Sequence, residues 1–152
     1  MCELSEVELY HILTSFRQAI KEAVNSGDLF DMKSFPFECC SYTSSLLQRY
    51  LIEEYGYFTW YMSGEYDNNG DFDSHAWLEN IDHSLVLDIT GDQFRYKRLK
   101  FTKSVYIGSR NNGFHNMFTL HEPVSYSFSN NPLDIDIKAE ERYETIKRFL
   151  DI

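Results

Sequence analysis

The period of the apolar residues changes near the middle of the chain, and this change limits the folds open to it. Apolar or small residues recur after Cys40 at offsets that fall on one helical face: Ser44, Leu47 and Leu51. Gly56 then closes the helical segment. From His75 to Glu79, apolar and polar residues instead alternate with the period of two that is typical of a strand. The sequence therefore predicts an α+β fold, with N-terminal helices packed on an antiparallel β-sheet.

The start of the predicted helix is set by Pro36, which disfavours helical structure in the residue before it. Cys40 should accordingly lie in the first helical turn. A helix N-terminus has partial positive charge and unpaired N–H groups. Both features favour a thiolate and can hold an oxyanion, so Cys40 is a candidate nucleophile.

Two strands are predicted after the helix, and they bring a histidine near an aspartate. The run from Leu85 to Leu87 is apolar and ends at Asp88, and a short link of residues 80–83 joins it to the strand that carries His75. Cross-strand neighbours in an antiparallel hairpin lie about 5 Å apart. We expect Asp88 to contact one ring nitrogen of His75 while the other faces Cys40. Acyl transfer through a thioester uses such a nucleophile, base and orienting acid.

Each candidate has a rival close to it in the sequence. Cys39 is an alternative nucleophile, although it would point about 100° away from Cys40 on a helix. His83 is an alternative base, and Asp82 or Asp92 an alternative orienting acid. Each residue also has a purely structural interpretation, as a buried core cysteine, a strand histidine or a turn-capping aspartate.

Four segments resemble the transglutaminase-like core of the papain-like cysteine hydrolases. The matching segments are the Cys40 helix with Ser44, the Gly-bounded strand 56–64, the triplet His75-Ala76-Trp77 and the triplet Asp88-Ile89-Thr90. The order Cys, His, Asp is the family order, and the resemblance covers roughly residues 35–94. The His-Ala-Trp-Leu-Glu form also looks like the small bacterial proteases that remove leader peptides from lasso peptides.

The resemblance implies a papain-like core and a catalytic triad of Cys40, His75 and Asp88, with no metal or organic cofactor. It implies an acyl-transfer enzyme that acts on a peptide or protein substrate as a peptidase, amidase or deamidase. A transglutaminase with an amine acceptor, and a catalytically idle papain-like module that binds a peptide or protein, are the alternatives. In papain a glutamine shortly before the cysteine helps to hold the oxyanion. No glutamine occurs between Asn25 and Cys40, so the second donor stays unassigned.

Composition excludes several other classes of protein. The 152 residues predict a single domain, 1–152. A net charge of −10 argues against a basic surface that binds nucleic acid. No apolar run of 18 or more residues predicts a membrane span, and the acidic N-terminus lacks a signal-peptide core, so we expect a cytoplasmic protein. Three cysteines are an odd number and do not suggest a disulfide framework.

The segments outside the matching region are predicted from local patterns. Ser5 and Glu8 form a capping-box pattern for a first helix, whose apolar face is predicted to hold Val7, Tyr10, Leu13, Phe16, Ile20 and Val24. Residues 28–38 form a connecting loop, which we expect to be anchored by Phe30, Phe35 and Phe37. Residues 109–137 are polar and irregular, and His115 and His121 within them have no partner pattern. A final helix is predicted from about Ile137.

Overall fold

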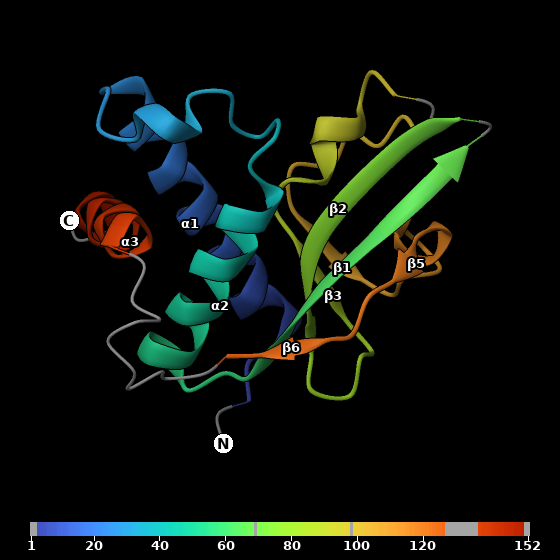
Figure 1. The fold of residues 1–152 in the computed structure, drawn as a ribbon. Coiled ribbons are helices and arrows are strands. Elements are labelled where there is room, and N and C mark those ends of the chain that lie inside the picture. The colour runs from blue at the N-terminus through green and yellow to red at the C-terminus, as the bar shows by residue number, and fades with distance from the viewer. Residues whose placement is uncertain (1–2, 69, 98, 127–136, 151–152) are drawn as a thin grey trace.

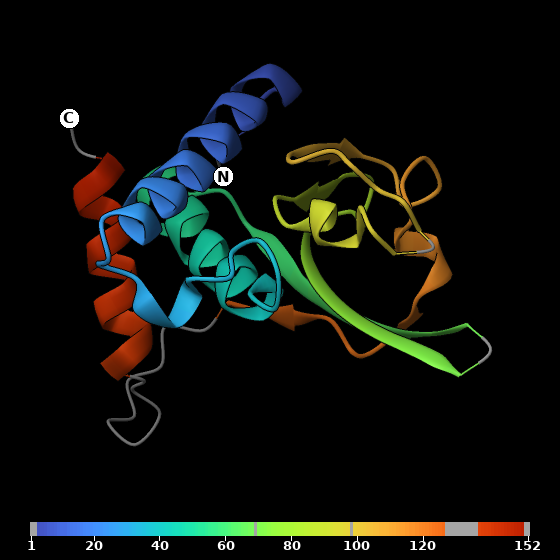
Figure 2. The same ribbon diagram turned by 90° about the horizontal axis from the view of Figure 1, so that it is seen from above.

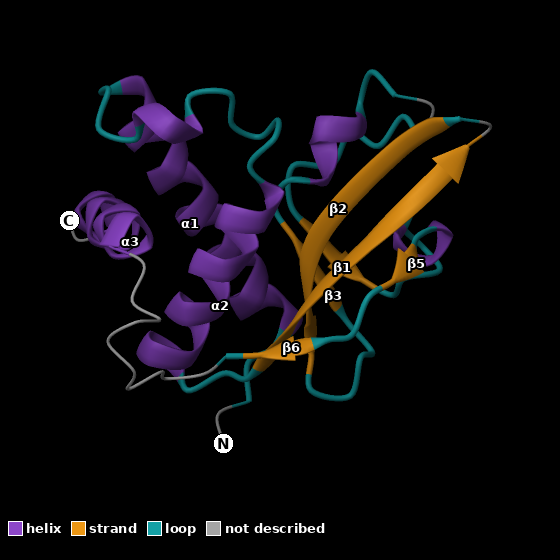
Figure 3. Ribbon diagram, viewed as in Figure 1, coloured by secondary structure: helices purple, strands orange, loops and turns teal. Residues whose placement is uncertain are grey.

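The computed structural model describes residues 3–68, 70–97, 99–126 and 137–150. The helices gather on one side of the molecule and the sheet with its covering loops on the other (Figures 1 and 3). The α-helices are α1 (Glu6–Asn25), α2 (Cys40–Tyr55) and α3 (Ile137–Leu150), and α3 packs on α1. Short 3-10 helices are η1 (Phe30–Met32), η2 (Gly91–Phe94) and η3 (His115–Met117).

The sheet has six antiparallel strands, which confirms the predicted α+β fold of helices packed on an antiparallel sheet. The strands are β1 (Thr59–Asn68), β2 (Asp71–Asn80), β3 (Val86–Asp88), β4 (Tyr106–Gly108), β5 (Thr119–Leu120) and β6 (Val124–Ser125). Their order is β4-β3-β2-β1-β5, and β6 also pairs with β1. The long strands β1 and β2 therefore form the centre of the sheet, and β3 lies beside β2.

The β1–β2 hairpin is longer than the sequence pattern predicts. The sequence predicts a strand over residues 57–63, followed by a turn from Gly64 to Asp73 with Asn69-Gly70 at its tip. Instead, the two strands stay paired as far as Asn68 and Asp71. Gly70, with a φ of 90°, allows a two-residue turn to close the hairpin directly. The hairpin tip extends away from the helices (Figure 2).

Helix α1 begins with the predicted capping box, because the Ser5 side chain accepts from the Glu8 N–H and Glu8 accepts from the Ser5 N–H. Its buried face is rotated from the predicted one: Leu9, Leu13, Phe16, Ala19, Ile20 and Ala23 are buried. Val7 and Tyr10 are 68% and 51% exposed, so their predicted burial is wrong. Two apolar stripes overlap along this helix, and the stripe that includes small alanines is the buried one, on the helix against which α3 packs.

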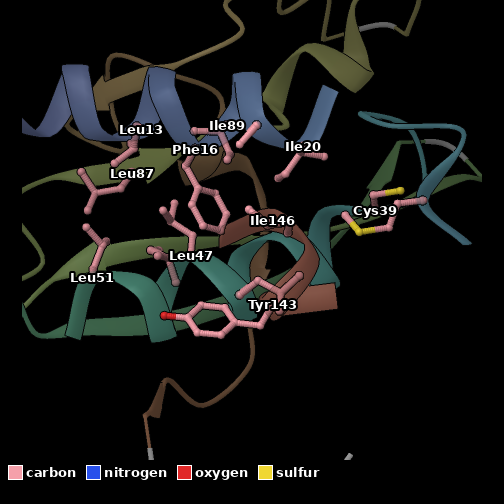
Figure 4. Close-up of a cluster of buried hydrophobic side chains, with 14 of the residues drawn as sticks. Leu13, Phe16, Ile20, Cys39, Leu47, Leu51, Leu87, Ile89, Tyr143 and Ile146 are labelled. Carbon is pink, nitrogen blue, oxygen red and sulfur yellow. The ribbon is translucent and has the colours of Figure 1, made fainter. Parts of the chain in front are cut away.

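Two hydrophobic clusters lie on opposite faces of the sheet. The cluster on the helical side joins all three α-helices to the sheet residues Leu78 and Leu87, and Figure 4 shows Cys39 at one end of it. The cluster on the other side is largely aromatic: Met62, Trp77, Val86, Phe94, Tyr106, Phe114 and Phe118. The sheet is therefore buried on both faces around the strands that hold His75 and Asp88.

The loop before α2 is held differently from the prediction. Leu29 and Met32 are buried, and Phe35 packs against the helical cluster. Phe30 and Phe37 are 72% and 38% exposed, so neither is the anchor we expected. In the part of the chain that the structure describes, no helix combines the length and apolar character that a membrane crossing needs.

Candidate active site

Cys40 is the first residue of α2, as its spacing predicts. The first helical hydrogen bond runs from the Thr43 N–H to the Cys39 carbonyl, at 2.9 Å. The side chain of Cys39 at the N-cap makes no capping hydrogen bond. The N–H groups of the first turn are therefore free of a side-chain cap, and they present positive partial charge beside the thiol. Gly56 ends the helix with a φ of 61°, also as predicted.

The backbone of Ala76 joins the start of α2 to β2. The Ser44 hydroxyl donates to the Ala76 carbonyl at 3.2 Å, and the Ala76 N–H donates to the Cys40 sulfur. Both groups of Ala76 thus point away from β1 and toward α2. The thiol lies at the edge of β2, where it can meet the ring of the preceding residue, His75.

His75 lies between a carboxylate and the thiol. Its Nε2 atom is 2.7 Å from the Asp88 Oδ2 atom, which confirms the predicted contact between these two residues. Its Nδ1 atom is 2.9 Å from the Gln93 Nε2 atom, and the ring also hydrogen-bonds to Cys40. His75 and Asp88 are each 2% exposed. Because the Nε2–H group donates to the Asp88 carboxylate, Nδ1 is the ring atom that can accept a proton from the thiol.

The three side chains shift one another's acidity in a consistent direction. Burial alone would raise the pKa of Cys40, but hydrogen bonding and the charge of His75 outweigh it, so the pKa of the thiol is lowered. Burial would lower the pKa of His75, but the Asp88 charge and hydrogen bond raise it to about 9. Despite burial, the two neighbouring histidines hold the pKa of Asp88 well below its ordinary value. The site therefore favours a thiolate next to an imidazolium.

A second histidine shares the Asp88 carboxylate. The His115 Nε2 atom is 2.7 Å from the same Oδ2 atom that holds His75. The other carboxylate oxygen accepts from the Thr90 N–H at 2.9 Å and from its hydroxyl at 3.4 Å. His115 is fully buried, and its Nδ1 atom has no hydrogen-bond partner among the described residues. Nδ1 faces the backbone of Gly113, where a Cβ atom would come within 2.9 Å of it.

Sequence reasoning missed both His115 and Gln93. His115 lies 27 residues after Asp88 in a segment without periodicity, and only the tertiary fold brings the two together. Gln93 follows Asp88 by five residues and stands on η2. Its short distance from Asp88 in the sequence is the one local signal that could have identified it, because η2 begins three residues after Asp88.

The rival candidates have other partners. Cys39 is buried in the helical cluster, and burial together with the Cys40 charge raises its pKa to about 11. The His83 Nδ1 atom is 2.8 Å from Glu79, and Asp92 forms a bidentate pair with Arg17. The fourth rival, Asp82, accepts from the N–H of Ser84 on the exposed loop between β2 and β3. None of these four is described in contact with the His75 ring.

An open cavity of about 590 Å³ lies over the thiol. Cys40, His75 and Gln93 contribute to its floor, and Phe37 and Phe72 contribute exposed aromatic rings to its wall. Cys40 is thus reachable from outside while His75 and Asp88 are shielded from water. This combination of a reachable nucleophile and buried supporting groups suits covalent chemistry on a bound substrate.

His75, Asp88 and His115 also form a donor set of the kind that binds a transition metal, since one atom of each lies within 4.8 Å of the others. The two Nε2 atoms, however, are each 2.7 Å from the same oxygen. That is a hydrogen-bond distance, and it is shorter than the roughly 3.3 Å between ligands in a tetrahedral zinc site with bonds of about 2.0 Å. As they stand, the three side chains fit shared protons better than a metal ion.

The assignment of these residues to a candidate active site is based on their geometry alone. No family model matches the chain, and no curated protein or solved structure matches it either.

Proposed function

We propose that this protein is a cysteine-dependent acyl-transfer enzyme with Cys40 as nucleophile, His75 as base and Asp88 as the orienting acid. The observation that carries the proposal is the continuous chain of hydrogen bonds from the Cys40 thiol through the buried His75 ring to Asp88. A purely structural cysteine has no need of a lowered pKa, a protonated partner and an open cavity together.

In the proposed reaction the Cys40 thiolate attacks an amide or ester carbonyl carbon, and the carbonyl oxygen becomes an oxyanion. His75, protonated on Nδ1, gives its proton to the leaving amine or alcohol, and the carbon–nitrogen or carbon–oxygen bond breaks. A thioester remains on Cys40. Water then attacks the thioester while His75 takes its proton, which releases a carboxylic acid and restores the thiol pair. Asp88 holds the ring throughout and stabilises its charged form.

Gln93 is our candidate for the oxyanion donor that the segment before Cys40 lacks. Its amide Nε2 atom lies 2.9 Å from the His75 Nδ1 atom, and the amide also interacts with the thiol, so it lies beside the position of the reacting carbon. Nε2 can donate to Nδ1 only while that atom is unprotonated, so protonation of His75 leaves this donor available to an oxyanion. The N–H groups at the start of α2, which no side chain caps, are the second candidate donors. Together they form the pair of donors that an oxyanion site requires.

The resemblance to transglutaminase-like and papain-like hydrolases supports this proposal. Under the proposal, the chain folds into the papain-like core of these enzymes. An antiparallel sheet packed on a helix that begins with the nucleophile is what such a core requires. Hydrolysis of a peptide or protein is the preferred outcome, because this compact arrangement exposes the thiol to water. Free thiols at Cys39 and Cys40 suit a reducing compartment such as the cytoplasm.

Acylation by p-nitrophenyl acetate tests the proposal without knowledge of the natural substrate. We expect a burst of p-nitrophenol and an acetyl group on the peptide that contains Cys40, both of which the Cys40→Ala variant loses. Cys39→Ala is the matched control and should keep the burst. The absence of a burst would refute the acyl-transfer proposal and favour an idle binding module, and a burst that survives in Cys40→Ala would refute Cys40 as the nucleophile.

The His-Asp-His cluster supports a second candidate, a buried metal centre, since its three donor atoms are close together. The two functions exclude each other, because a metal would replace the protons that link His75 to Asp88. Zinc added to the chelator-treated protein decides between them. A rise in melting temperature that His115→Leu abolishes would favour the metal centre. An unchanged melting temperature, together with the Cys40 burst, favours acyl transfer.

A further inference from the structure

The pairing of β1 with β2 fixes which backbone groups of β2 point outward. In an antiparallel ladder, successive residues alternate between pointing at the partner strand and pointing away from it. Ala76 points away from β1, because its N–H and carbonyl bond to α2 side chains. Asn80 does so too, since its N–H donates to the Leu85 carbonyl at 3.0 Å. Ser74 has the same parity, and the register has no break, so its N–H and carbonyl also point outward.

The outer edge of β2 is covered only along part of its length. Strand β3 pairs with β2 at Leu78 and Glu79, and α2 covers the edge at Ala76. Among the described residues, no strand pairs with this edge at Ser74, which is an exposed residue. Ser74 also lines the cavity that holds Cys40. The backbone N–H and carbonyl of Ser74 are therefore available in the cavity, beside the nucleophile, to pair with another strand.

The spacing along β2 matches the chemistry at Cys40. Ser74 and Ala76 are two residues apart, which is roughly 6.6 Å along a strand. A polypeptide that pairs with Ser74 would thus place one of its own peptide bonds, about two residues from the paired one, at the level of Ala76. The Cys40 sulfur lies at this level and can attack that bond. Small amides cannot use this edge, because they lack a second backbone amide to pair with Ser74.

The charge of the cavity wall selects among polypeptides. Three carboxylates line it, those of Glu38, Glu65 and Asp73, against one ammonium group, that of Lys97. Lys97 lies 3.4 Å from Asp73 and offsets that charge, so Glu38 and Glu65 remain as the negative groups that face an occupant. His121, at 3.6 Å from Glu65, adds positive charge only when protonated. The wall is therefore complementary to a basic segment.

We propose that the cavity binds a basic polypeptide segment in extended form, as an added strand on the edge of β2 at Ser74. The inference rests on the proposed acyl transfer, and it names the substrate class: a polypeptide and not a small amide. Affinity comes from backbone hydrogen bonds, as in other cases of strand addition, and the alternating side chains of the segment face the cavity wall.

The test compares how fast two reagents alkylate Cys40. One is iodoacetamide, and the other is the capped peptide probe acetyl-Ala-Lys-Ala-Ala chloromethyl ketone, whose chloride the thiolate displaces to form a carbon–sulfur bond. We divide the rate with the peptide probe by the rate with iodoacetamide and normalise this ratio to the same ratio for free cysteine. The reactivity of the thiol cancels, so the normalised ratio measures only how well the peptide binds beside Cys40. An unactivated Cys40 would refute the acyl-transfer proposal but leave this ratio measurable.

We expect the normalised ratio to exceed ten in the wild type. It should return to about one when every internal amide of the probe is N-methylated, and it should fall when the lysine is replaced by glutamate. Ser74→Pro removes an N–H that takes no part in the ladder with β1, so the sheet should persist while the ratio is lost. Ser74→Ala is the matched control and should keep the ratio.

Unchanged iodoacetamide labelling and melting temperature in Ser74→Pro show that the site is intact. A wild-type ratio near one, or a high ratio that survives both N-methylation and Ser74→Pro, would overturn strand addition. A high ratio for the glutamate probe as well would overturn the preference for a basic segment.

Discussion

Asp88 is the residue on which the charge balance of the site depends, because one of its carboxylate oxygens accepts from two imidazole rings. The folded state raises the pKa of His75 from 6.5 to about 9 and lowers that of Asp88. A raised histidine pKa stabilises the fold fully below pH 6.5, and this contribution is lost as the pH rises through about 9. A lowered carboxylate pKa stabilises the fold above about pH 3.8, and that contribution is lost as the pH falls.

We therefore predict that the wild type exceeds Asp88→Asn in the free energy of unfolding most strongly between about pH 4 and pH 6.5. The difference should shrink steadily as the pH rises toward about 9. Urea unfolding of both proteins across this range, followed by circular dichroism, measures it. Two stability profiles that run parallel from pH 6.5 to pH 9.5 would show that His75 gains no proton affinity from Asp88.

At the level of residues, the sequence was sufficient for the groups that belong to regular elements. Cys40 could be placed from helical spacing, and the contact between His75 and Asp88 followed from two adjacent strands. His115 and Gln93 could not be placed, because both lie on short 3-10 helices whose positions depend on packing and not on a repeating pattern. The polar partners of a buried group are fixed by three-dimensional proximity, which a single sequence does not display.

At the level of elements, α1 holds the segment that supplies both Asp88 and Gln93. The Arg17 guanidinium donates to both carboxylate oxygens of Asp92, at 3.0 and 2.9 Å, and to the Ile89 carbonyl at 2.6 Å. Arg17 and Asp92 side chains are 11% and 2% exposed, so water screens this pair little. These bonds join α1 to the segment between Asp88 and Gln93, which includes the start of η2.

We predict that Arg17→Met lowers the free energy of unfolding by about 3 kcal/mol, because it leaves the buried Asp92 carboxylate with Arg95 as its remaining described ion-pair partner. The double variant with Asp92→Asn should recover part of this loss, since the unpaired charge is then gone. Urea unfolding of the single and double variants measures both values. Additive losses would mean that the two side chains do not interact energetically.

The helical face of α1 illustrates what local patterns can and cannot decide. Its start was fixed by two residues that contact each other through the capping box, and that prediction is confirmed. The buried face was not fixed, because Val7 and Tyr10 fit a helical stripe as well as Leu9 does. Which stripe is buried depends on where α3 and the sheet lie, and that is a property of the assembled layers.

At the level of the whole molecule, the sheet separates two clusters and leaves one stretch of edge open. The helical cluster fixes α2, and the aromatic cluster surrounds His75 with rings from Trp77, Phe94 and Phe114. The α+β class could be predicted from the change of period, whereas the length of the β1–β2 hairpin could not, because its polar arms lack an apolar alternation. The open edge at Ser74 is a consequence of that length.

The central claim is that the folded protein keeps Cys40 as a thiolate paired with His75. The most direct test is the rate of Cys40 alkylation by iodoacetamide as a function of pH, mapped by peptide mass in a Cys39→Ala background. Asp88→Asn serves as the variant that preserves side-chain shape, and His75→Ala as the one that removes the partner. An ordinary thiol reaches half its maximal rate near pH 8.5.

We predict that Cys40 reaches half its maximal alkylation rate well below pH 8.5, because hydrogen bonding and the charge of His75 lower its pKa. His75→Ala should raise that midpoint, since burial then outweighs the hydrogen bonds from Ala76 and Gln93 that remain, and Asp88→Asn should move it part of the way. A wild-type midpoint at or above pH 8.5 that neither variant changes would contradict the thiolate–imidazolium pair, and the acyl-transfer function with it.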